Sequence, residues 1–110
     1  MKDDEKIRVI IKRPGEKYGH RASIKNDLKN LQKIVEGDIE MVRLWPDAAI
    51  ICNEEGKIKG LKPNMYVGTF PFGDLIMGTL IVAGVDGEEL TDCPLSRWKW
   101  EQYVDAWGNY

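Results

Sequence analysis

The stretch from residue 73 to residue 90, GDLIMGTLIVAGVDGEEL, constrains the fold of this chain most. Its aliphatic and β-branched run from Leu75 to Ala83 predicts a buried β-strand. Asp86-Gly87 follows, and glycine readily adopts the positive φ that a tight hairpin turn requires. We therefore expect the strand to end in a hairpin turn at residues 85–88, which favours antiparallel pairing.

The glycines of this region could instead belong to a phosphate-binding loop. Such loops space their glycines as G-x-G-x-x-G or G-x-x-x-x-G-K, so that backbone N–H groups converge on an anion. The glycines at positions 68, 73, 78 and 84 lie five or six residues apart, and none precedes a lysine. This spacing favours the strand and hairpin over a phosphate loop.

The remaining sequence predicts further strands and two helices. Strands are expected at residues 7–12, 38–44 and 48–52, with a short return strand over 57–61. Aliphatic residues at helical spacing predict a helix over about residues 23–36, capped by Ser23 and stopped by Gly37. A closing helix is expected to begin near Pro94, capped by Thr91 or Asp92, and to continue to Trp107. Residues 53–56 are typical of a turn, and residues 62–74 predict a long irregular loop rich in aromatic side chains.

These elements predict an α+β fold: a mixed, mostly antiparallel sheet of four or five strands packed by one or two helices. The 110 residues, 43% of them hydrophobic, are enough for one domain with its own core. The apolar runs are far shorter than the roughly 20 residues of a membrane span. The charged start, residues 1–6, lacks the apolar segment of a secretory signal. We therefore expect a cytoplasmic protein that does not bind membranes.

Residues suited to catalysis or metal binding are sparse. The chain has two cysteines, Cys52 and Cys93, and a single histidine, His20, which do not form a zinc-site spacing. Cys52 lies in an apolar run and is expected in the core. Cys93 precedes a proline near a helix start, where a thiolate gains some stabilisation. We expect no catalytic residues, no metal site and no cofactor, and therefore a protein that is not an enzyme.

Basic residues gather near the N-terminus. Residues 6–25 hold seven Lys and Arg against one Glu, a balance of +6 in a chain whose net charge is −2. Such a segment attracts a phosphorylated ligand or an acidic protein surface, but it is too small for general DNA binding. Guanidinium groups suit phosphate, a tyrosine ring can stack on a base, and a protonated histidine can donate. The candidate ligand-binding residues are Arg13, Lys17, Tyr18, His20 and Arg21.

Aromatic residues gather in the C-terminal third. On the closing helix, Trp100, Tyr103 and Trp107 share one side, whereas Trp98 projects from the opposite side. One interpretation packs the first three on the sheet and lays Trp98 over residues 62–74. The other makes an aromatic side an interface for a partner protein or for self-association, since Trp and Tyr concentrate binding energy. The candidate interface residues are Tyr66, Phe70, Phe72 and Trp98.

Several segments together resemble a known family. The sequences LKNLQKIVEG, DIEMV, ICNEEGKIKGLKPN and MGTLIVAG, in this order, are similar to a domain-of-unknown-function family numbered 3846, common in phages and mobile elements of bacteria. The resemblance spans about residues 7–92 and carries over no catalytic residue. The stretch MYVGTFPFG and the Trp-rich end depart from the family pattern.

The resemblance implies a small phage or mobile-element protein in the cytoplasm of a bacterial host. By analogy with other small phage proteins, we expect it to act by binding rather than by catalysis. One hypothesis is a counter-defence protein that sequesters a nucleotide-derived signal. The alternative is a protein–protein interaction module that blocks a host defence protein. The basic and aromatic residues together slightly favour the first hypothesis, because they suit a small planar anion.

Overall fold

The computed structural model describes residues 5–110, so most of the charged start lies outside the described residues. Residues 5–110 form eight strands and two helices in this order: β1 (Lys6–Lys12), β2 (His20–Lys25), α1 (Leu28–Val35), β3 (Ile39–Trp45), β4 (Ala48–Asn53), β5 (Pro63–Val67), β6 (Asp74–Met77), β7 (Leu80–Asp86), β8 (Glu89–Thr91) and α2 (Arg97–Trp107). The main sheet has the order β2-β1-β7-β4-β3, with β8 also paired to β7, and β5 and β6 form a second, two-stranded sheet. Every one of these pairs is antiparallel. The predicted α+β fold is confirmed, with six strands in the main sheet rather than four or five.

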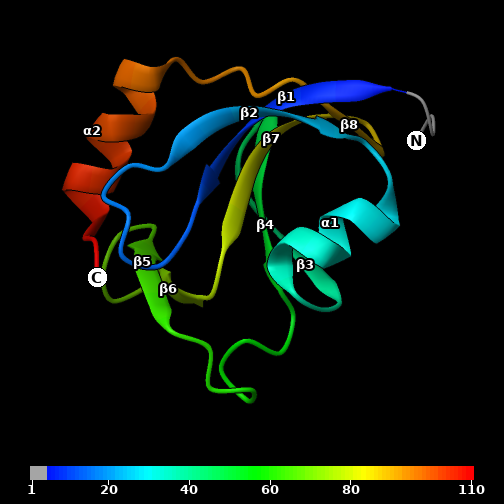
Figure 1. The fold of residues 1–110 in the computed structure, drawn as a ribbon. Helices are drawn as coiled ribbons and strands as arrows, with labels where there is room; N and C mark the ends of the chain where they lie inside the picture. The colour runs from blue at the N-terminus through cyan, green and yellow to red at the C-terminus, as the bar shows by residue number, and fades with distance from the viewer. Residues whose placement is uncertain (1–4) are drawn as a thin grey trace.

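The main sheet is covered on both faces, as Figure 1 shows. One face packs against α1, and its core includes Ile7, Leu31 and Ile81. The other face packs against α2 and the β5–β6 hairpin, and its core includes Met65 and Trp100. Successive strand residues point to opposite faces. A strand covered on both faces therefore needs the continuous apolar runs found in β4 and β7.

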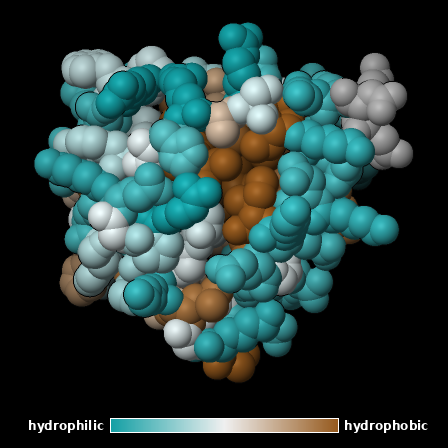
Figure 2. Space-filling view, viewed as in Figure 1, coloured by the Kyte–Doolittle hydropathy of each residue, from teal (hydrophilic) through white to brown (hydrophobic). Residues whose placement is uncertain are grey.

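The surface seen from the side of α1 is mostly hydrophilic (Figure 2). An apolar area lies at the centre of this view beside α1. A second apolar area lies at the bottom, where the β4–β5 loop runs in Figure 1. Ile58, in that loop, is 85% exposed. Within residues 5–110, no helix is long and apolar enough to cross a membrane.

The predicted single strand over residues 75–83 is wrong, because the chain changes sheets in its middle. Strand β6 ends at Met77 and pairs with β5, whereas β7 begins at Leu80 and pairs with β1 and β4. Gly78 lies between them with a φ of +83°. A Cβ there would press on the side chain of Leu61. The predicted hairpin that follows is confirmed, with Gly87-Glu88 joining β7 to β8 and Gly87 at a φ of +63°.

The predicted start of the first helix at Ser23 is also wrong. Ser23 lies on β2 opposite Arg8 of β1, and α1 begins five residues later at Leu28. Its N-cap is Asp27, whose side chain accepts a hydrogen bond from the backbone N–H of Asn30 at 2.8 Å. An aspartate at this position satisfies a free N–H of the first turn. The left-handed residue that ends the helix is Glu36, just before the predicted Gly37.

Three other predicted boundaries differ. Residues 57–61 form a turn segment instead of a strand, and the predicted loop over 62–74 contains β5, with Met65 and Val67 buried. Helix α2 begins at Arg97 with Ser96 as its N-cap. Thr91 ends β8, and the Asp92 carboxylate accepts a hydrogen bond from the Arg8 backbone N–H at 2.7 Å. Neither residue is therefore available to cap the helix.

A buried polar cluster joins the hairpin to the main sheet. The Lys12 ammonium donates to Oδ1 of Asn64 at 2.7 Å and to Oδ1 of Asn109 at 2.6 Å. The Asn64 amide donates to the backbone carbonyls of Lys12 at 2.7 Å and Gly78 at 2.9 Å. Lys12 is fully buried, and this burial lowers the pKa of its ammonium to about 8, against an opposing effect of the Glu16 charge. One charge of the basic segment is thus structural and does not reach the surface.

Candidate ligand-binding site

Three long-range hydrogen bonds fix the β1–β2 loop and the start of β2 to α2 and to the segment just before it. The Trp100 indole N–H donates to the Tyr18 carbonyl at 2.8 Å, across 82 residues of sequence. The Tyr18 hydroxyl donates to the Asp105 carboxylate at 2.8 Å, and the Arg21 guanidinium donates to the Leu95 carbonyl at 2.9 Å. Since Trp100 is 1% exposed and packed in the core, it anchors the loop at a defined position against the helix.

A cavity of about 170 Å³ lies between this loop and the helix. Its lining residues are Ile10, Tyr18, Gly19, His20, Arg21, Arg97, Trp100 and Glu101. Gly19 has a φ of +78°, and a Cβ there would collide with the backbone of Ile11 and Lys12. The glycine therefore lets the chain pass close to β1 and enter β2 with His20 and Arg21 at the cavity.

Two guanidinium groups from different elements border the cavity. Arg21 comes from β2 and Arg97 is the first residue of α2. The Nε of Arg97 donates to Glu101 at 2.9 Å, and the Arg97 side chain is 81% exposed. Each guanidinium has five N–H donors and spends few of them on its own chain. The remaining donors suit a phosphate, which guanidinium groups bind with paired hydrogen bonds.

His20 belongs to a small charged network beside the cavity. Its Nδ1 lies 3.5 Å from the Glu16 carboxylate, and Nη1 of Arg13 lies 3.7 Å from the same carboxyl group. The pKa of Glu16 lies below its ordinary value: slight burial raises it, but hydrogen bonds from the Arg13 backbone and from His20 outweigh this effect. The network holds His20 in place through an anionic partner.

The predicted ligand-binding residues separate into two groups. Tyr18, His20 and Arg21 meet at the cavity. Arg13 instead borders another hollow, next to the turn segment before β5, and the Lys17 ammonium lies 5.1 Å from the Tyr18 ring centroid. The sequence analysis missed Arg97, Trp100 and Glu101 as cavity residues. Their spacing of three and four residues on a helix was a usable signal, because it places them on neighbouring parts of one face.

The predicted interface residues separate as well. Tyr66 and Phe70 are in ring contact at 5.7 Å, and Phe70 and Phe72 are 79% and 91% exposed around the β5–β6 connection. The Tyr66 N–H donates to the Gly108 carbonyl, beside the C-terminal end of α2. Trp98 lies in the first turn of α2, about 14 Å along the helix axis from that end. It is 66% exposed.

The other aromatic residues of α2 pack against the core: Trp100 is buried, and Tyr103 and Trp107 are partly buried. Trp45, the last residue of β3, contacts Trp100, Tyr103 and Trp107 at centroid distances of 6.5, 5.3 and 5.7 Å. This arrangement agrees with the interpretation that these three residues pack on the sheet. Trp98, at 66% exposed, is the most exposed aromatic residue of this helix.

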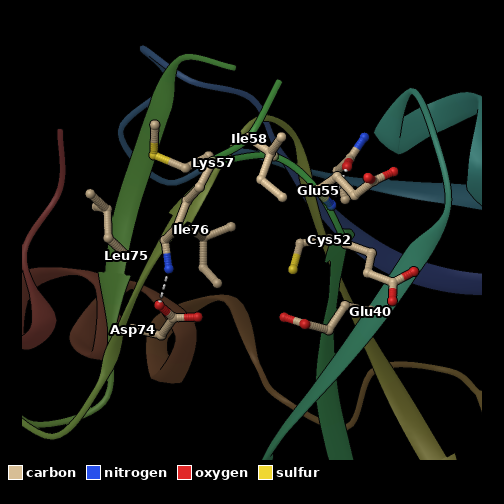
Figure 3. A pocket seen from close by; sticks show the side chains of 12 residues that line it. Glu40, Cys52, Glu55, Lys57, Ile58, Asp74, Leu75 and Ile76 are labelled. Atoms are coloured by element: carbon tan, nitrogen blue, oxygen red, sulfur yellow. Dashed lines mark hydrogen bonds and ion pairs between the residues drawn. The ribbon is translucent and has the colours of Figure 1, made fainter. Parts of the chain in front are cut away.

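A second cavity, of about 260 Å³, lies between β6, β3 and the β4–β5 loop (Figure 3). Lys57 and Asp74 form an ion pair at 2.5 Å on one wall, and Glu40 lies on the other. The Cys52 thiol faces the space between them, and burial raises its pKa to about 12. Nucleophilic attack requires the thiolate. Burial therefore disfavours the thiolate form of Cys52 in this cavity.

The remaining candidates for chemistry also have structural roles. Asn53 accepts a hydrogen bond from the Glu55 N–H at 2.8 Å and donates to the Val35 carbonyl at 3.1 Å, so it shapes the turn after β4. Burial raises the pKa of the Cys93 thiol as well. Among residues 5–110, no group of three or more His, Cys, Asp and Glu side chains is placed to hold a metal ion.

The fold and the cavity define a small α+β domain, built on an antiparallel sheet, with a cationic cavity between a loop and a helix. The chain belongs to the family described as Domain of unknown function (DUF3846), whose family model matches residues 7–108. The match includes α2, which lies beyond the residue 92 at which the resemblance was expected to end. No curated protein and no solved structure matches the chain significantly.

Proposed function

We propose that this protein is a small non-catalytic binding protein that sequesters a phosphorylated, nucleotide-like ligand. The cavity between the β1–β2 loop and α2 carries this proposal, because it combines two guanidinium groups with an aromatic wall. In a phage or mobile element, such a protein removes the nucleotide-derived signal of a host defence system from the bacterial cytoplasm. The ligand leaves the protein unchanged in this proposal.

The charges around the cavity support an anionic ligand. Arg21 and Arg97 contribute two permanent positive charges, and His20 adds a donor. Glu101 opposes them, but its carboxylate already accepts from Arg97. A phosphate entering the cavity therefore competes with the Glu101 carboxylate for Arg97. At Arg21 its competitor is an uncharged group, the Leu95 carbonyl, which accepts from the guanidinium at 2.9 Å.

The double variant Arg21→Ala/Arg97→Ala is expected to weaken binding of inorganic phosphate and of AMP at least about tenfold. Each lost charged hydrogen bond contributes about 1.5–3 kcal/mol, and about 1.4 kcal/mol corresponds to a factor of ten. NMR titration of the ¹⁵N-labelled protein measures both affinities and shows whether the shifted amides surround Tyr18. Mass spectrometry of the ligand released by heating tests whether it returns intact.

Two control variants make this result specific. Lys29→Ala/Lys99→Ala removes two positive charges from exposed helix positions that do not border the cavity, so affinity should stay within about twofold. Glu101→Gln removes the competing carboxylate and should strengthen binding by about two- to fivefold. Equal losses for both double variants would contradict the proposal, because they would show only a general effect of net charge.

A second candidate function is supported by the exposed side chains of Phe70 and Phe72. A protein that blocks a host defence protein presents apolar anchors of this kind, and exposed aromatic residues dominate such interfaces. If this function holds, Phe70→Ser/Phe72→Ser should abolish co-purification of one specific partner from host lysate, and Arg21→Ala/Arg97→Ala should mainly slow association. Native mass spectrometry of the wild type and the two double variants in the same lysate shows which of them retain the partner. Retention of the partner by the phenylalanine variant would argue against this function.

A further inference from the structure

We infer that Trp98 is the platform on which the planar ring of the ligand stacks, while the phosphate of the same ligand lies between Arg21 and Arg97. This inference rests on the proposed function and adds the class of ligand to it. The ligand is a single nucleotide unit, with a phosphate at one end and an unpaired aromatic ring at the other.

Trp98 does not itself line the cavity, but on α2 it follows Arg97, which does, and it lies on the side of the helix turned away from the buried Trp100. At about 100° per residue, Trp98 lies about 60° around the helix from Glu101 and about 100° from Arg97. Both of these residues line the cavity. Trp98 also lies within about 20° of Asp105, whose carboxylate accepts the hydrogen bond from Tyr18. The Trp98 side chain therefore leaves the helix next to the surface formed by Arg97 and Glu101, at the mouth of the cavity.

The exposure of Trp98 leaves its ring free to bind. The other tryptophans of α2 already have ring partners within the protein, since Trp100 is 1% exposed and Trp107 contacts the rings of Trp45 and Tyr103. Trp98 is 66% exposed in the same helix. An indole face open to water stacks on any nucleobase, because every base has a π-face.

The size of the cavity explains why a platform outside it is needed. Pockets that enclose a whole small-molecule ligand usually measure about 300–1,000 Å³. The cavity of about 170 Å³ admits a phosphate with part of the attached sugar, and leaves the ring outside. A base outside the cavity is held only by its covalent connection to the bound phosphate, unless an aromatic side chain lies beside the cavity opening. Trp98, the residue next to Arg97, supplies that side chain.

The test compares AMP with inorganic phosphate on three proteins: the wild type, Trp98→Ala and Trp98→Phe. Trp98→Ala should weaken AMP binding at least about fivefold and leave phosphate binding unchanged, because stacking involves only the ring. Trp98→Phe keeps an aromatic face and should retain most of the AMP affinity. Indole fluorescence gives an independent readout, since AMP should quench the wild type and should quench Trp98→Phe much less. Because Trp98 is exposed, neither substitution should unfold the protein, and circular dichroism of both variants checks this.

The outcomes separate this inference from the proposed function. If Trp98→Ala binds AMP as tightly as the wild type, and both still depend on Arg21 and Arg97, the platform is wrong and the phosphate site stands. A parallel loss of AMP and phosphate binding in Trp98→Ala also overturns the platform, because it indicates a structural role. If the wild type binds neither AMP nor phosphate, the proposed function and the platform fail together.

Discussion

Replacing Asn64 with alanine is expected to lower the free energy of unfolding by about 3–5 kcal/mol, the largest effect among the variants considered. The Asn64 side chain accepts from the buried ammonium of Lys12 and donates to two backbone carbonyls. Its removal leaves a buried charge with one fewer partner, and breaking such an arrangement on one side costs about 3–5 kcal/mol. Urea unfolding followed by tryptophan fluorescence measures the difference.

Asn109→Ala is the matched control for this prediction. It removes the other acceptor of Lys12, but Asn109 is exposed, so water can replace its oxygen. A loss of about 0.5–1.5 kcal/mol is expected, the usual value of one hydrogen bond. The double variant Lys12→Met/Asn64→Leu should be more stable than Asn64→Ala, because it removes the buried charge together with its partner. Equal destabilisation by Asn64→Ala and Asn109→Ala would contradict this account of the cluster.

The second large effect is a pH dependence of stability that comes from Lys12. Its pKa is about 8 in the folded protein against an ordinary value of 10.5. Between these two values the unfolded chain holds one more proton than the folded chain, so the free energy of unfolding rises with pH. The slope approaches about 1.4 kcal/mol per pH unit, and the total gain is up to about 3 kcal/mol. Below pH 8 this contribution is constant, since both states keep the proton.

The difference between the wild type and Lys12→Met isolates this effect. The ionisable groups that both proteins share cancel in the difference. Unfolding free energies measured from pH 7 to pH 10.5 should show the wild type gaining on Lys12→Met across the interval. Parallel curves would show that the ammonium keeps its ordinary pKa, with its two amide oxygens compensating fully for burial.

The sequence predicted the bounds of β1, β3 and β4 to within one residue, because each has an apolar pattern of its own. Strand β4 is fully buried over its six residues, and its composition alone indicates a central strand. Strand β2 was missed because only Ile24 of its six residues is buried. Its structure comes from pairing with β1 along its whole length, from His20 opposite Ile11 to Lys25 opposite Lys6. Pairing with another strand is not visible in the strand's own residues, so neither their β-propensity nor the periodicity of their apolar residues predicts it.

The break at Gly78 and the hairpin strand β5 have the same kind of cause. A continuous apolar pattern ran through Gly78, and nothing local showed that the two halves belong to different sheets. In β5, Pro63 and Asn64 resemble loop residues. Asn64 is buried because its partner Lys12 lies 52 residues away. A buried polar residue of this type becomes predictable only when its partner is known.

The candidate site was predicted from one side only. Tyr18, His20 and Arg21 were identified because basic and aromatic residues lie close together in the sequence. Arg97 and Glu101 were missed because nothing near them in the sequence links α2 to the β1–β2 loop, and the hydrogen bond from Trp100 to Tyr18 spans 82 residues. The residues near the β1–β2 loop indicated a site for an anion, whereas the shape of the cavity depends on α2 and could not be predicted from the loop.

The placement of α1 on the sheet face opposite α2 provides a position for chemical attachment. Both native thiols have pKa values raised by burial, so thiol-reactive reagents, which attack the thiolate, modify them slowly. Lys33 is exposed on α1, and Lys33→Cys would carry a thiol that reacts before the native ones. A dye or a sensor chip coupled there lies across the sheet from Arg21 and Arg97. The protein can thus be immobilised in one orientation with its cationic cavity open to solution.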